Sequence, residues 1–105
     1  MADADIPRHY RSLKERFPEV MGAVETLGGT VRRQGSLNGR TAHLVQLAAA
    51  AAIGSEGAVH SHARRALEEG AEPEEIYHTV LLLISTIGFP RAAAAISWVD
   101  DIVGD

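Results

Sequence analysis

The chain has 105 residues, a hydrophobic fraction of 46% and an aromatic fraction of 5%, so it fits one domain with a core of small aliphatic side chains. Its net charge of −4 argues against nucleic acid as a partner, and the absence of cysteine excludes disulfides, thiolate metal sites and thiol catalysis. No segment has the pattern of a signal peptide or the length of a membrane span, so we expect a cytoplasmic protein without a membrane partner.

Gly and Pro divide the chain into five or six predicted helices. The first covers residues 6–17 and the second roughly residues 18–34, which begin with a proline suited to a first helical turn. The third covers residues 38–53, with Asn38 as the expected N-cap and Gly54 as the stop. This third helix is apolar almost all round, which predicts a central helix buried on nearly every side.

The second half of the chain continues the helical pattern. Ser55 is the expected cap of a fourth helix that ends near Gly70, and a fifth helix begins at a proline followed by two acids and spans residues 73–88. The last helix covers residues 91–103. No segment alternates with period two, so the fold class is all-α, with residues 1–105 forming a single domain.

Histidines in or beside apolar helices are the candidate functional residues. Two of them, His60 and His62, lie two residues apart, which separates them by about 200° around a helix. We interpret His60 as part of a solvated charged stripe that also contains Glu56. His62 falls among apolar residues and is therefore expected to point inward.

A second polar group lies on the apolar third helix, where His43 and Gln46 occur together. Burying such groups costs free energy unless each finds a partner. Convergence of the third and fourth helices would bring His43 and His62 to a shared polar pocket. A hydrogen-bonded core histidine is the structural alternative to a catalytic one.

The order of motifs resembles the carboxymuconolactone decarboxylase and AhpD-like alkylhydroperoxidase superfamily. The resemblance is carried by the segment SEGAVHSHARRALEEGAEPEEIYHTVLLLISTIGFPRAAAAI, and FPEVMGAVETLGG and LNGRTAHLVQLAAAAAIG are similar to the family's first helices. Within the core segment the family's Glu, His, Ala-Leu, Gly, acidic helix start and Gly-Phe-Pro turn match Glu56, His62, Ala66-Leu67, Gly70, Pro73-Glu74-Glu75 and Gly88-Phe89-Pro90. The resemblance implies an AhpD-like bundle that forms homo-oligomers built on dimers or trimers, hexamers in particular. An alanine-rich core too small to cover several apolar helices agrees with self-association.

The chain departs from the family pattern at the positions that carry chemistry. The Cys-x-x-Cys pair of AhpD-like members is replaced by Ser55 and Ala58, so thiol-based peroxide reduction is excluded. The usual Glu of the third helix is His43, and a frequent Glu in the fifth is His78. The Glu that decarboxylases place four residues before the His is also Ala58. The substrate therefore cannot be carried over from the family.

Three functions remain. The first is a lyase that acts on a small organic acid or lactone by proton transfer, with His62, His43 and Glu56 as catalytic residues. The second is a transition-metal site formed by His43, His62 and His78; otherwise no cofactor is expected. The third is a non-catalytic assembly or binding protein on the same scaffold. The expected partners are a small-molecule ligand and further copies of the chain.

Overall fold

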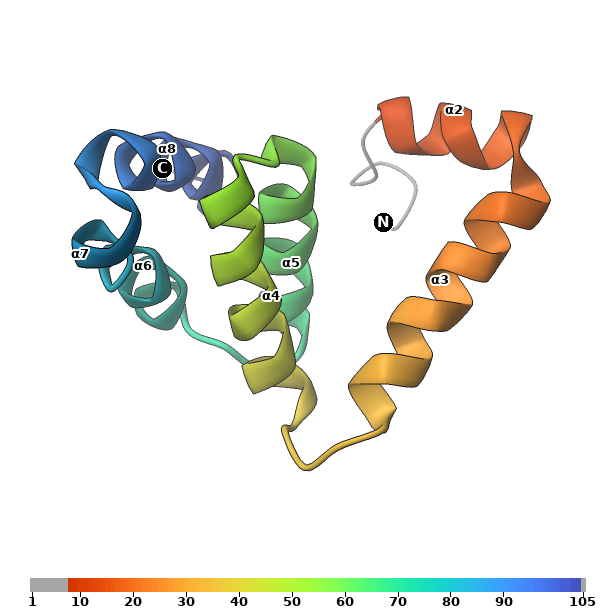
Figure 1. The fold of residues 1–105 in the computed structure, drawn as a ribbon, viewed down its shortest axis with the longest axis horizontal. Coiled ribbons are helices and arrows are strands. Elements are labelled where there is room, and N and C mark those ends of the chain that lie inside the picture. Colours follow the sequence, from red (N-terminus) through yellow and green to blue (C-terminus); the bar gives the residue numbers. More distant parts are fainter. Residues whose placement is uncertain (1–7, 105) are drawn as a thin grey trace. The chain divides into compact units, whose positions relative to one another are not determined.

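The fold is known from a computed structural model that describes residues 8–104, and this part of the chain contains helices and no strand (Figure 1). The predicted all-α class is confirmed. The helices are, in chain order, α2 (Arg8–Arg16), α3 (Pro18–Arg33), α4 (Gly39–Ile53), α5 (Glu56–Glu68), α6 (Pro73–Leu81), the four-residue α7 (Ile84–Ile87) and α8 (Phe89–Val103). None of these described helices is both long enough and apolar enough to cross a membrane. Residues 6 and 7 of the first predicted helix lie outside the described residues.

The chain divides into two compact units, residues 1–36 and 37–105. In the described part of the first unit, α2 packs against α3. Lys14 Nζ lies 3.3 Å from Glu25 Oε2, and the Tyr10 hydroxyl donates a hydrogen bond to the same carboxylate. None of the residues of α3 is buried. The first unit therefore has polar cross-links between its helices but exposes most of its apolar side chains.

The ends of α4 and α5 are fixed by the residues expected from the sequence. The Asn38 side chain accepts a hydrogen bond from the Thr41 N–H at 2.8 Å, which caps α4. Gly54 ends the helix with φ +75°, a left-handed conformation that glycine adopts without steric cost. Ser55 Oγ then accepts from the Ala58 N–H at 3.4 Å and caps α5. Gly54 and Ser55 together form the short connection from α4 to α5.

The core of the second unit lies where α4, α5, α6 and α8 meet, and Figure 1 shows α4 and α5 side by side. Its buried residues are Leu47, Ala50, Ala51, Val59, Ala63, Ala66, Ala71, Ile76, Val80, Ala92, Ala95 and Val99. Seven of these twelve residues are alanines, and their small side chains let the helix axes approach closely. The prediction that α4 is buried on nearly every side is wrong for this chain, since Val45 and Ile53 are exposed. Val45, Ala49, Ala52 and Ile53 form one exposed stripe along α4, and most of its other residues are buried or half-buried.

The predicted fifth helix over residues 73–88 is wrong in its second half. Helix α6 ends at Leu81, and the Leu83 N–H bonds the Val80 carbonyl at 2.9 Å in a tightened turn before α7. This turn directs Leu83 and Ile84 against the core, while Leu82 stays exposed. Helix α8 also begins earlier than residue 91, because its proline occupies the first turn, as prolines favour.

Candidate functional site

His43 and His62 meet where α4 packs against α5. His43 is buried, with 4% of its surface exposed, and its Nδ1 lies 3.1 Å from His62 Nδ1. The ring centroids are 5.3 Å apart and the ring planes are tilted by 37°, so the rings meet edge to edge at nitrogen rather than stack. The prediction that His62 points inward and reaches His43 is confirmed. The positions of the two α5 histidines around the helix were sufficient for this prediction, because only His62 lies on the apolar side of α5.

The contact between the two Nδ1 atoms requires opposite tautomers. In a neutral pair, one ring carries the proton on Nδ1 and donates it, while the other ring accepts with its Nδ1 lone pair. The donor ring then has its remaining lone pair on Nε2, and the acceptor ring has its proton on Nε2. The pair therefore combines one proton acceptor and one proton donor. The two roles exchange between His43 and His62 when the shared proton crosses, the acceptor ring gives up its Nε2 proton and the donor ring gains one at its own Nε2.

Gln46 follows His43 by three residues on α4, so the two side chains leave neighbouring positions on the helix surface. Its Oε1 atom is buried and has no hydrogen-bond partner within residues 8–104. A buried carbonyl oxygen without a partner is uncommon, because it loses its hydration without compensation. This amide oxygen is a candidate acceptor for a hydroxyl or an acid proton of a ligand.

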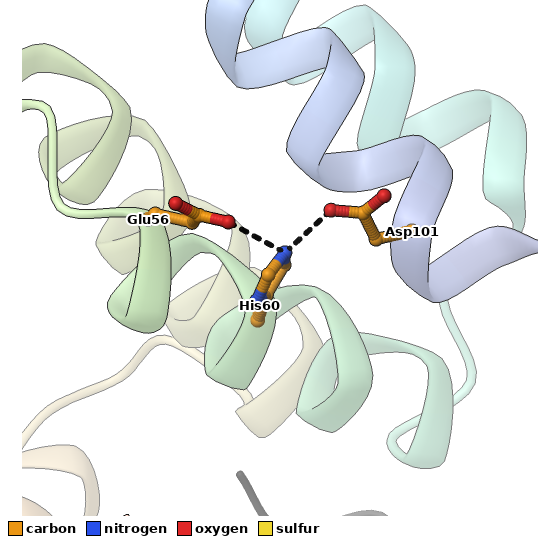
Figure 2. Close-up of side chains that lie close together, drawn as sticks. All are labelled: Glu56, His60 and Asp101. Atoms are coloured by element: carbon orange, nitrogen blue, oxygen red, sulfur yellow. Dashed lines mark hydrogen bonds and ion pairs between the residues drawn. The ribbon is translucent and has the colours of Figure 1, made fainter. Parts of the chain in front are cut away.

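Glu56 does not join the histidine pair, contrary to the site expected from the sequence. Figure 2 shows that its carboxylate instead points toward His60, from the same helix, and that Asp101 of α8 approaches His60 from the other side. Glu56 and His60 are four residues apart and share a helix face, whereas His62 is rotated by about 200° from His60. The exposed fraction of the Glu56 side chain is 57%. The Glu56 carboxylate is therefore an ion-pair partner of His60 and does not contact the histidine pair.

His60 is less exposed than the sequence predicted when it placed this residue in a solvated charged stripe. Its side chain is 19% exposed, and its Nε2–H donates to Asp101 Oδ2 at 2.9 Å. Asp101 lies 41 residues further along the chain, and sequence reasoning missed it. The four-residue spacing of Glu56 and His60 indicates that these two side chains are neighbours. No pattern near them in the sequence indicates which residue of another helix also contacts His60.

His78 is exposed on α6. It follows the buried Ile76 by two residues, which turns it away from the core. In the part of the chain that the structure describes, the side chains gathered closely enough to hold a metal ion are Glu56, His60 and Asp101. The predicted set of His43, His62 and His78 is not gathered in this way.

These features define a small all-α protein with a histidine pair inside its main helix contact. The chain belongs to the carboxymuconolactone decarboxylase family, whose sequence model matches residues 18–101 and so spans both compact units. An uncharacterized protein of Methanocaldococcus jannaschii is 31% identical over 93 residues, which are 89% of this chain and 87% of that protein. The crystal structure of an apo carboxymuconolactone decarboxylase family protein from Legionella pneumophila matches with a TM-score of 0.79 at 22% identity, over 96% of this chain and 90% of that one. That likeness shows the fold. A single domain over residues 1–105 stays a prediction.

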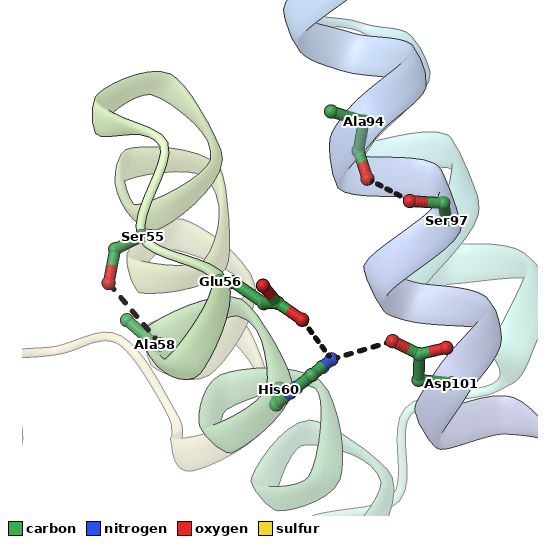
Figure 3. A network of polar contacts seen from close by, with 7 residues as sticks. All are labelled: Ser55, Glu56, Ala58, His60, Ala94, Ser97 and Asp101. Atoms are coloured by element: carbon green, nitrogen blue, oxygen red, sulfur yellow. Dashed lines mark hydrogen bonds and ion pairs between the residues drawn. The ribbon is translucent and has the colours of Figure 1, made fainter.

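The positions of the AhpD-like cysteine pair have a structural role in this chain. Figure 3 shows Ser55 and Ala58 joined by the capping hydrogen bond at the start of α5. A hydroxyl at this position satisfies one of the free amides of the first helical turn. It cannot pass through the sulfenic acid and disulfide states of a thiol.

Proposed function

We propose that this protein is a decarboxylase-like lyase that moves protons on a small organic acid or lactone through His43 and His62. The observation that carries the proposal is the 3.1 Å approach of their Nδ1 atoms. Decarboxylation breaks the bond between a carbon and its carboxyl group, carbon dioxide leaves, and the electron pair stays on the carbon skeleton as a carbanion or enolate. A proton must then be delivered to that skeleton, for which an imidazole is a suitable acid near neutral pH.

The histidine pair supports this reaction because it holds a donor and an acceptor at once. One ring gives its Nε2 proton to the product carbon and receives the shared Nδ1 proton from the second ring. The second ring takes a proton from water at its own Nε2, so both rings are neutral again and their roles are exchanged. The chain thus regenerates its acid without a carboxylate, which agrees with the absence of Glu56 from this contact.

Gln46 Oε1 has no hydrogen-bond partner among residues 8–104, which supports binding of a ligand that brings a hydrogen-bond donor. An organic acid or a hydroxylated lactone has such a group, and pairing with it removes the cost of a buried, unsatisfied carbonyl. Gln46→Met removes the acceptor and keeps the volume, whereas Gln46→Glu keeps an acceptor oxygen at the same position. We therefore expect Gln46→Met to weaken binding of a ligand that donates a hydrogen bond more than Gln46→Glu does.

Turnover by wild-type protein tests the proposal. The probes are carboxymuconolactone and a panel of small unsaturated lactone acids and β-keto acids, with carbon dioxide release and proton NMR in deuterium oxide as readouts. We expect turnover of at least one compound, with deuterium at the product carbon. His62→Ala and His43→Ala should each lower kcat by about 10²–10⁴-fold, whereas His78→Ala, a matched exposed histidine, should leave it unchanged. Full turnover by both site variants would contradict the proposal.

We also propose that copies of this chain associate, as a hexamer built from dimers or trimers. Along α3, Val20, Val24, Leu27 and Val31 are 53–62% exposed and repeat at helical spacing, which forms an apolar stripe suited to a second copy. Light scattering should show the oligomer in the wild type and a smaller species for Val24→Glu. Thr26→Glu, on the other side of α3, is the control. A wild-type monomer at micromolar concentration would contradict self-association.

A non-catalytic assembly protein is the second candidate function, and the exposed apolar stripe of α3 favours it. A non-catalytic assembly protein would form the oligomer but neither bind nor turn over any compound of the panel. In that case His62→Ala would lower stability without any other effect. Both functions predict the oligomer, so the turnover and ligand-binding measurements separate them.

A further inference from the structure

Glu56, His60 and Asp101 form a second cluster, distinct from the histidine pair. Figures 2 and 3 show the two carboxylates pointing at the same imidazole nitrogen from opposite sides, one from α5 and one from α8. His60 Nε2 lies 2.9 Å from Asp101 Oδ2 and 3.9 Å from Glu56 Oε2, and the three ligand atoms lie within 4.8 Å of one another. We infer that this cluster binds a divalent transition-metal ion such as Zn²⁺.

The spacing of the cluster fits a metal ion. Two donor atoms about 2.0–2.2 Å from a tetrahedral zinc lie about 3.3–3.6 Å from each other. The His60–Asp101 distance of 2.9 Å is slightly below this range, and the His60–Glu56 distance of 3.9 Å is slightly above it. Glu56 and His60 are four residues apart on one helix, the spacing at which helical zinc sites place two ligands. Small changes in the exposed side chains of Glu56 and Asp101 are enough to bring all three donors into place.

The charges of the cluster also favour a cation. Among the described residues, both Glu56 and Asp101 have His60 as their ion-pair partner, and neither pairs with a lysine or arginine. Two carboxylates therefore share at most one positive charge. A divalent cation supplies the charge that a single imidazolium does not. A salt bridge between α5 and α8 would need only the Asp101 carboxylate, so the second carboxylate favours a cation rather than a simple ion pair.

The donor set selects the kind of metal. One imidazole nitrogen and two carboxylate oxygens suit zinc and its first-row neighbours rather than calcium, which takes oxygen ligands only. Binding displaces the proton from His60 Nε2 in favour of the metal ion. An imidazolium releases this proton to solvent and keeps the one on Nδ1, whereas a neutral ring moves its proton to Nδ1. Three protein ligands leave at least one coordination position for water. Because the ligands come from α5 and α8, the metal also links these two helices.

Metal titration of the tag-free, chelator-treated full chain tests the inference. Zn²⁺ binding is followed by calorimetry, and Co²⁺ binding by its visible absorption. We expect one ion per chain, and we expect Asp101→Asn and Glu56→Gln each to weaken binding by at least about tenfold. Both substitutions keep the side-chain shape at positions that are 57% exposed, so circular dichroism should show an unchanged helix content. His62→Ala and His78→Ala are the matched histidine controls and should bind as the wild type does.

A second readout does not depend on calorimetric affinity. Zn²⁺ should raise the melting temperature of the wild type, because the ion binds the folded chain, and should fail to raise that of Asp101→Asn. The inference is overturned if the wild type binds neither ion at micromolar concentration, or if Asp101→Asn and Glu56→Gln bind as tightly as the wild type. It is equally overturned if His62→Ala abolishes binding, since the ion would then belong to the histidine pair. Failure of lyase activity leaves this outcome unaffected, because the two sites share no residue.

Discussion

Replacing His43 and His62 by alanine, singly and together, measures the interaction between the two rings. His43 is 4% exposed, so loss of its partner ring removes a hydrogen bond from a group that water reaches poorly. Leaving a buried polar group with one fewer partner costs about 1–3 kcal/mol. We therefore expect each single variant to lose about this much unfolding free energy. The double variant should lose less than the sum, with a coupling energy of about 0.5–1.5 kcal/mol for one neutral hydrogen bond.

The assay is urea unfolding at pH 8 followed by the fluorescence of Trp98. This residue is the single tryptophan of the chain and packs against the core of the unit that contains both histidines. Thermal melting is the second measurement, in which 1 kcal/mol corresponds to about 4–8 °C for a domain of this size. His78→Ala, at an exposed histidine, should change the unfolding free energy by less than about 0.5 kcal/mol.

A coupling energy of zero within error would refute the contact between Nδ1 atoms, because two independent histidines give additive losses. The proton-sharing mechanism would lose its basis with it. Additive but large losses would mean that each ring is stabilised by other neighbours.

Three further experiments test the fold and the excluded chemistry. Gly54→Ala should lower the free energy of unfolding by about 1–2 kcal/mol in urea unfolding, because φ is +75° at this position. The loss should be smaller when Arg91 is also replaced by alanine, since the new Cβ would lie 2.2 Å from Arg91 Nη1. Ile76→Ala, at a fully buried position, should cost about 2–5 kcal/mol, whereas Leu81→Ala, 49% exposed, should cost less than about 0.5 kcal/mol in the same measurement. A coupled peroxidase assay with thiol donors should show no turnover, and measurable turnover by pure protein would contradict the exclusion of thiol chemistry.

Features decided by neighbouring residues were predictable from the sequence. Asn38 and Gly54 fixed both ends of α4, because a capping side chain and a left-handed glycine act within one turn of the helix. The inward direction of His62 followed from helical phase alone. Such signals need no knowledge of how the helices pack.

Features decided by packing were not predictable. The residues around Leu83 contain neither glycine nor proline, yet the helix stops there because a tightened turn lets Leu83 and Ile84 reach the core. The approach of Asp101 to His60 depends on the crossing of α5 and α8, two helices far apart in the sequence. The sequence also placed Glu56 with the histidine pair through family resemblance, although its helical phase matches His60.

Helix capping and thiol reactivity compete for the same position at the start of α5. The free amides of a first turn can be capped by a hydroxyl, as at Ser55, or can stabilise a thiolate and lower the pKa of a cysteine. A single Ser55→Cys replacement would therefore create an activated thiol in a chain that otherwise has none. Such a thiol could not form a disulfide within its own chain. Its rate of labelling would report how often the first turn of α5 opens, and would so serve as a probe of local helix dynamics.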